Sequence, residues 1–123
     1  MDRLRQRADF LAVAGGARVN STAFTLQCRR RDDLGPTRIG FTVTRKNGSA
    51  TERNRIRRRL REVVRRLDVM AMRPHHDYVL IGRRAALTRD FAAMADDLAL
   101  ALRRIERHCA NSAKPGTDDE SKR

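Results

Sequence analysis

The stretch that most constrains the fold is residues 53–67, which reads RNRIRRRLREVVRRL. Eight of the fourteen residues from 53 to 66 are arginine, so much of this segment must face water or an anion. The apolar residues recur every three or four positions, which is the spacing of one stripe along an α-helix. That stripe consists of Ile56, Leu60, Val63, Val64 and Leu67. The sequence therefore predicts a helix that packs one side on a core and carries arginines elsewhere.

The start of this helix is chemically unusual. Ser49 and Glu52 have the spacing of a capping box, so the helix should begin near residue 50. Arg53 and Arg55 then lie in or near the first turn, where the helix dipole disfavours cations. Arg53 also falls on the apolar side, and because an unpaired buried guanidinium is too costly, we expect it to emerge past the core. Backbone N–H groups and arginines that converge in this way favour a bound phosphate, although an ordinary solvated basic face is the alternative.

The whole chain is strongly basic, with a formal net charge of +13 over 123 residues and a pI of about 11.5. A charge this large repels itself and suits a polyanionic partner. Of the 28 basic residues, all but Lys46, Lys114 and Lys122 are arginine, a bias that is either functional or genomic. The length suits one domain with a modest core.

Nothing in the sequence predicts a membrane span or a signal peptide. No run of eighteen apolar residues occurs, and residues 1–10 lack an apolar segment. Cys28 and Cys109 are too few and too far apart for a zinc motif, and without export a disulfide is not expected. We therefore expect a cytoplasmic protein with reduced thiols and no membrane partner.

The rest of the chain alternates between helix and strand patterns. Helices are expected at 5–14 and 89–108, and strands at 18–21, 23–29, 38–45 and 78–81. The strands at 23–29 and 38–45 should pair as an antiparallel hairpin, and the continuously apolar run at 78–81 should be buried on both faces. The resulting order, αβββαβα with the basic helix in the middle, predicts an α+β sandwich with helices on a small sheet.

The C-terminal segment, 111–123, has no large apolar side chain and nearly balanced charges. Such a composition predicts a disordered tail, which leaves residues 1–110 as a single folded domain. The net charge therefore belongs to the folded part.

One face of the predicted hairpin is small and polar. The core-facing positions are Phe24, Leu26, Cys28, Ile39, Phe41 and Val43. The opposite positions are Thr25, Gln27, Gly40, Thr42 and Thr44. A face of this kind is either simply solvated or forms the floor for an extended single strand of nucleic acid bounded by arginines.

No constellation for self-contained chemistry is present in the sequence. We find no carboxylate pair, no Ser/His/Asp or Cys/His set and no glycine-rich phosphate loop. Glu62 is accounted for by pairs with Arg58 and Arg66 four residues away on either side. The His75-His76 pair has no third ligand nearby, so we expect an exposed loop, no metal site and no small-molecule substrate. The residues alone indicate an RNA- or DNA-binding domain.

Residues 38–62 resemble the protein subunit of bacterial ribonuclease P. In that family a strand ends in Val-Ser-Lys-Lys, a Gly-x-Ala turn follows, and an Arg-Asn-Arg motif opens a basic helix. The corresponding segments here are Val43-Thr44-Arg45-Lys46, Gly48-Ser49-Ala50 and Arg53-Asn54-Arg55. Asp9-Phe10 and Asp77-Tyr78-Val79 match as well, and the resemblance covers residues 2–106 in one unbroken order.

The resemblance implies a sandwich of the ribosomal S5 domain 2-like type, with a left-handed crossover around the basic helix. It also implies a ribonucleoprotein endonuclease that removes the 5′ leader of precursor tRNA. Catalysis would reside in ribonuclease P RNA, with Mg²⁺ bound mainly through that RNA, and the protein alone would be inactive. The expected RNA-binding residues are Arg45, Lys46, Arg53, Asn54, Arg55, Arg57, Arg58, Arg61 and Arg65. The leader cleft would be lined by Phe10, Thr25, Gln27 and Thr42.

The chain departs from the family pattern in the expected cleft. Ala14 and Gln27 stand where the family often has aromatic residues, which implies weaker stacking on leader bases. The alternative function is a ribosomal or general RNA-chaperone protein with a similar fold. A DNA-binding regulator is disfavoured, because no helix-turn-helix pattern is present.

Overall fold

The computed structural model describes residues 2–33, 35–67 and 72–112, with side chains described as far as residue 107. In chain order the elements are β1 (Asp2–Arg3), α1 (Arg7–Ala14), β2 (Ala17–Asn20), β3 (Phe24–Arg30), β4 (Arg38–Val43), α2 (Ala50–Arg66), β5 (His76–Gly82) and α3 (Phe91–Ser112). Two short 3-10 helices, η1 (Arg45–Asn47) and η3 (Arg84–Leu87), precede α2 and α3. The α+β class and the three helices predicted from the sequence are confirmed.

The strands form one mixed sheet in the order β1-β4-β5-β3-β2. The expected hairpin of β3 with β4 is wrong, because β5 lies between them, antiparallel to β3 and parallel to β4. The physical reason is the apolar run of β5, which gains most from a central place with strands on both sides and a layer over each face. The short strand predicted at 18–21 is confirmed as β2, which pairs with β3.

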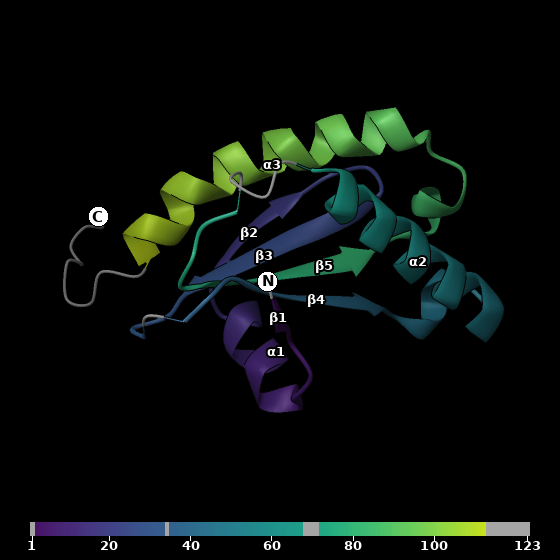
Figure 1. The fold of residues 1–123 in the computed structure, drawn as a ribbon. Helices are drawn as coiled ribbons and strands as arrows, with labels where there is room; N and C mark the ends of the chain where they lie inside the picture. The colour runs from purple at the N-terminus through teal and green to yellow at the C-terminus, as the bar shows by residue number, and fades with distance from the viewer. Residues whose placement is uncertain (1, 34, 68–71, 113–123) are drawn as a thin grey trace.

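The sheet separates two layers of helices. α2 and α3 cover one face, and α1 covers the other (Figure 1). The main core lies under α2 and α3, and its largest fully buried members are Phe24, Leu26, Ile56, Leu60, Leu80, Met94, Leu98 and Ile105. A smaller core of Leu4, Val13 and Val79 lies under α1. The predicted alternation is therefore confirmed for β3, whose Phe24, Leu26 and Cys28 belong to the main core.

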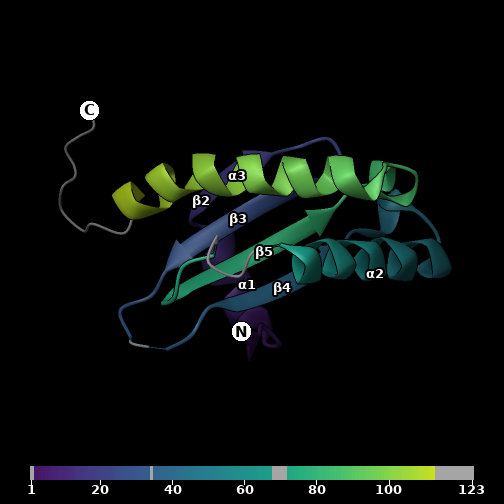
Figure 2. The same ribbon diagram turned by 45° about the horizontal axis from the view of Figure 1, so that its top comes forward.

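The connection from β4 through α2 to β5 is a parallel crossover. In Figure 2 both strands point to the right, β5 lies above β4, and α2 lies in front of the sheet. This arrangement is left-handed, whereas almost all such crossovers in proteins are right-handed. The handedness implied by the family resemblance is therefore present in the fold.

The predicted capping box at the start of α2 is confirmed. The Ser49 hydroxyl accepts a hydrogen bond from the Glu52 backbone N–H at 3.2 Å, and the Glu52 carboxylate accepts one from the Ser49 N–H at 2.9 Å. The apolar stripe of α2 packs directly on the end of β5. A Cβ at Gly82 would lie 2.4 Å from Cγ2 of Ile56, so no larger residue fits there without moving the helix.

Helix α3 extends to Ser112, which is past the predicted end near residue 108 and past the predicted domain boundary at 110. The predicted tail from residue 113 onward lies outside the described residues, so its disorder stays a prediction. Among the helices described, none is both long enough and apolar enough to cross a membrane.

Candidate RNA-binding site

The start of α2 presents cations because its one carboxylate is already engaged. Arg84 of η3 donates two hydrogen bonds to Glu52, at 2.9 and 3.2 Å. These bonds, together with the hydrogen bond from the Ser49 backbone, lower the pKa of Glu52 to about 2. The Glu52 carboxylate is thus ionised, but its negative charge is paired with Arg84. It therefore repels an incoming phosphate only weakly.

Apart from Arg84, the basic residues around this helix start have no carboxylate partner among the described residues. Arg55 and Arg58 are exposed on α2, and Arg45 and Lys46 are exposed on η1 just before it. Arg53 is half-buried, and its Nε is buried with no hydrogen-bond partner in the described part of the chain. A buried donor without a partner is costly, so an external acceptor such as a phosphate oxygen would stabilise it.

Two further arginines of the predicted set lie toward the edge of the sheet. Arg57 donates a hydrogen bond to the Asn54 side chain. The Arg61 guanidinium lies 5.8 Å from the centroid of the Phe41 ring on β4, within cation–π range. Burial, followed by repulsion from the nearby Arg3 and Arg57, lowers the pKa of Arg61. Such a cluster attracts an anion.

Arg65 differs from the other predicted residues because it is ion-paired. Glu62 accepts from Arg65 at 2.9 Å and from Arg66 at 3.1 Å. The predicted pair of Glu62 with Arg66 is confirmed, whereas the predicted pair with Arg58 is replaced by one with Arg65. We expect Arg65 to contribute less to RNA binding than the helix start does.

A groove lies between α1 and the sheet, where the leader cleft was expected. Its lining consists of Arg5, Arg7, Phe10, Leu11, Ala14, Gln27, Phe41, Thr42, Val79 and Ile81. Three of the four predicted cleft residues are therefore brought together: Phe10, Gln27 and Thr42. We name this feature the α1 groove. Arg5, Arg7 and the exposed Leu11 at its mouth were not predicted from the sequence. The signal for this face of α1 was weak, since it consisted of the three-residue spacing of Phe10 and Val13.

The fourth predicted cleft residue, Thr25, does not line the groove. Its hydroxyl donates to the Asn20 side chain at 2.9 Å and accepts from Arg83 at 3.1 Å. Thr25 is only 3% exposed, so it is a buried polar link and is not available to a ligand. The sequence could not indicate this, because alternation places a side chain on one face of a strand but does not say what covers that face.

Phe41 was predicted to face the core; it does pack against the main core, but it also has a second, exposed side that the sequence did not indicate. The ring is half-buried against the main core, lines the α1 groove and lies under Arg61. This is possible because β1 pairs with β4 only as far as Ile39, which leaves β4 as the sheet edge at residue 41. Phe41 therefore connects the α1 groove with the basic side of α2 around one strand edge.

The floor of the α1 groove depends on a glycine. A Cβ at Gly40 would lie 2.6 Å from two ring atoms of Phe10 and 3.1 Å from Cβ of Leu4. The Phe10 ring therefore rests directly on the β4 backbone. Any side chain at this position would push the ring outward into the groove.

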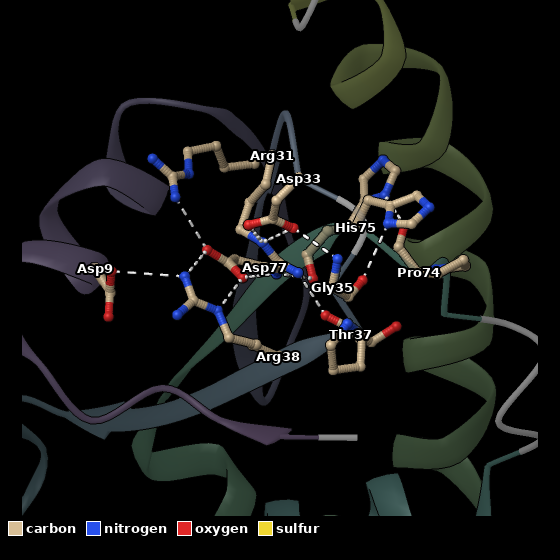
Figure 3. Close-up of polar contacts among 12 residues, drawn as sticks. Asp9, Arg31, Asp33, Gly35, Thr37, Arg38, Pro74, His75 and Asp77 are labelled. Atoms are coloured by element: carbon tan, nitrogen blue, oxygen red, sulfur yellow. Dashed lines mark hydrogen bonds and ion pairs between the residues drawn. The ribbon is translucent and has the colours of Figure 1, made fainter.

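Beside α1 lies a buried charge cluster that the sequence did not predict (Figure 3). Asp77 at the start of β5 is fully buried and is contacted by Arg31, Arg38 and Arg29. Arg38 donates two bonds of 2.8 Å to it and also lies 3.6 Å from Asp9 of α1. The cluster thus joins α1 and three strand ends. One signal for this cluster was present in the sequence, which is that Asp77 directly precedes an apolar run. Its arginine partners could not be inferred because they are distant in the sequence.

The histidine pair does not form a metal site with other described residues. His75 has a positive φ of 67°, and its Nδ1 lies 3.0 Å from the Gly35 carbonyl oxygen. Within the described ranges, no three His, Cys, Asp or Glu side chains are placed to hold a metal ion.

Comparison with known sequences gives a consistent result. The family model described as Ribonuclease P matches residues 1–106. The chain is 47% identical over 102 residues to the ribonuclease P protein component of Caulobacter vibrioides (strain NA1000 / CB15N), covering 82% of this chain and 68% of the relative. It is 50% identical over 103 residues to the protein component of Gluconacetobacter diazotrophicus, covering 83% and 89% respectively.

Comparison with solved structures supports the same assignment. The RNase P protein from Thermotoga maritima superimposes with a TM-score of 0.69 at 31% identity, over 85% of this chain and 97% of that one. The Staphylococcus aureus RNase P protein gives a TM-score of 0.70 over 88% and 98% of the two chains, and at 23% identity it shows likeness of fold. With the α2 motif, the sandwich and these matches in agreement, the chain belongs to the bacterial ribonuclease P protein family.

Proposed function

We propose that this protein component of ribonuclease P, an endoribonuclease involved in tRNA 5′ leader processing, binds the catalytic RNA through the start of α2 and holds the leader in the α1 groove. The observation that carries the proposal is the continuity of the two surfaces. Phe41 lines the groove, and Arg61 of the basic helix lies over its ring. A strand leaving the groove past β4 would meet the arginines of α2 at once.

The α1 groove suits a single-stranded leader. Arg5 and Arg7 at its mouth can meet backbone phosphates, while Phe10 and Phe41 offer aromatic faces to bases. Gln27 supplies a hydrogen-bonding side chain in the floor, where the family often has an aromatic ring. We therefore propose sequence-tolerant binding with few stacking contacts.

The α2 residues proposed to contact RNA are Arg53, Asn54, Arg55, Arg57, Arg58 and Arg61, with Arg45 and Lys46 of η1 extending the surface and Arg65 at its margin. Among the described residues, no carboxylate pairs with Arg53, Arg55 or Arg58, and this supports the choice. Catalysis would rest with the RNA, and Mg²⁺ would be bound mainly through that RNA, since the described protein residues do not fit a metal site.

Reconstitution tests the proposed function. We expect the RNA-free protein to leave precursor tRNA intact, because no acid/base or metal constellation is formed by the described residues. Addition of a bacterial ribonuclease P RNA at low Mg²⁺ should restore cleavage at the mature 5′ end. Mg²⁺-dependent cleavage by rigorously RNA-free protein, or no stimulation of the RNA by the protein, would contradict the proposal.

A substitution in the α1 groove tests leader binding. Phe10→Leu should keep most of the packing on Gly40 but remove the aromatic face, and one lost stack costs about 1 kcal/mol or roughly 5-fold in affinity. The measurement is the Kd of the reconstituted holoenzyme for precursor tRNA. Mature tRNA, which has no leader, is the control and should bind equally well to both proteins; an equal loss for both ligands would place the effect outside the groove.

A further inference from the structure

A second basic groove lies between α3 and β2, away from the two surfaces described above. Arg18 of β2 and Leu100, Arg103, Arg104 and Arg107 of α3 line it. We name it the α3 groove. The three arginines and the exposed leucine share one side of the helix, because their spacing of three and four residues repeats at 3.6 residues per turn.

None of the four arginines of the α3 groove has an ion-pair partner among the described residues. Acidic residues are present on α3, but two of them are engaged elsewhere. Glu106 pairs with Arg73, and Asp97 accepts from Arg89 at 2.7 Å. These two acids thus neutralise arginines outside the groove. The third acid of α3, Asp96, is exposed, and no described ion pair joins it to the groove arginines, which remain free to meet an external anion.

The position of the α3 groove relative to α2 suits one large ligand. Arg59 and Arg66 of α2 lie over the Phe91 ring at the start of α3, at 4.3 and 5.1 Å from its centroid. Arg103 is further along the same helix by about 18 Å, at a rise of about 1.5 Å per residue. Helix α2 therefore packs beside the first part of α3, and the α3 groove lies further along α3 in the same helical layer (Figures 1 and 2).

We propose that the α3 groove is a second phosphate-binding surface for the catalytic RNA, contacting a segment distant from the one held by α2. This inference rests on the proposed function. The groove arginines would each meet backbone phosphates of the RNA, and Leu100 would pack against a sugar or an unstacked base. Two separate anchor points, the start of α2 and the α3 groove, would fix the orientation of the protein on the RNA. A single cluster would leave that orientation loosely defined.

The test measures affinity of the full-length protein for ribonuclease P RNA at several salt concentrations. For Arg103→Gln with Arg107→Gln, loss of two phosphate contacts should reduce the log–log salt slope by about 1.4 to 1.8. The same relation gives a loss of about 10- to 30-fold in affinity near 0.15 M salt. Arg18→Gln, a substitution on a different element, should lower the slope by about half as much.

Two controls separate site-specific effects from net charge. Lys114→Gln with Lys122→Gln removes the same formal charge at two positions beyond the described residues and should change the slope much less. Arg103→Lys with Arg107→Lys keeps the charge and should retain most of the slope. An unchanged slope in the Arg103/Arg107 glutamine variant, or equal losses in the Lys114/Lys122 control, would contradict RNA binding by the α3 groove. Failure of the unmodified protein to bind this RNA would instead overturn the proposed function.

Discussion

Replacing Asp77 by alanine is expected to lower the free energy of unfolding by about 3–5 kcal/mol, the usual effect of removing one partner from a buried ion pair. Asp77 is fully buried, and Arg31, Arg38 and Arg29 all donate to it. Without the carboxylate, the guanidinium of Arg31 would remain buried with a large part of its charge uncompensated. That loss is a large share of a typical total stability of about 5–15 kcal/mol.

Asp33→Ala is the matched control for this prediction. Asp33 also accepts from Arg31, at 3.1 Å, but it is exposed to solvent. Its removal takes away the same kind of bond at the surface, where water replaces it, so we expect a much smaller effect. Urea unfolding of the two variants beside the unmodified protein measures the difference; similar losses from both would show that burial of Asp77 is not what matters.

The same cluster predicts a pH dependence. Burial alone would raise the pKa of Asp77, but the hydrogen bonds from Arg38 and Arg31 outweigh it and hold the pKa below its ordinary value. A carboxyl whose pKa is lower in the folded state stabilises the protein above its unfolded pKa, near 3.9, and loses that contribution as the pH falls further. Asp77→Asn should therefore flatten the decline of unfolding free energy below about pH 4.

The helices and the faces of the strands were predictable because their signals are local. The stripe of α2 and its capping box repeat over a few residues, and the structure places Ile56, Leu60 and Val63 in the core. Strand pairing was not predictable in the same way. Alternation in β3 and β4 is equally compatible with pairing to each other or to β5, and only the long-range burial of β5 decides between them.

The candidate site was predictable where it depends on one helix and less so where it depends on tertiary contacts. The α2 residues follow from one continuous motif, whereas the α1 groove combines α1, β3, β4 and β5. The exposure of Phe41 to the groove was not predictable because it is set by the short β1, and the burial of Thr25 was not predictable because it depends on the distant Arg83. Arg59 was left outside the RNA-binding set, and its Nε donates to the Ala86 carbonyl at 2.7 Å, which gives it a structural partner.

Replacing Arg53 and Arg55 together by alanine is expected to weaken binding to ribonuclease P RNA without destabilising the free protein. The two guanidinium groups lie in the first turns of α2, where the helix dipole repels them and no described carboxylate pairs with them. Their removal should leave the melting temperature equal or slightly higher. Two lost phosphate contacts should reduce the log–log salt slope by about 1.4 to 1.8 and the affinity near 0.15 M salt by about 10- to 30-fold.

Arg65→Ala is the comparison that decides whether the helix start is special. Arg65 is exposed on the same helix but is paired with Glu62, so it should contribute less per arginine removed. RNA affinity at several salt concentrations, with thermal melts of each free protein, provides both readouts. A simply solvated basic face would make the arginines equivalent, and equal losses per arginine would contradict the phosphate site. A clear drop in melting temperature for the double variant would instead show that Arg53 and Arg55 stabilise the fold, against the expectation from the Nε of Arg53, which has no partner among the described residues.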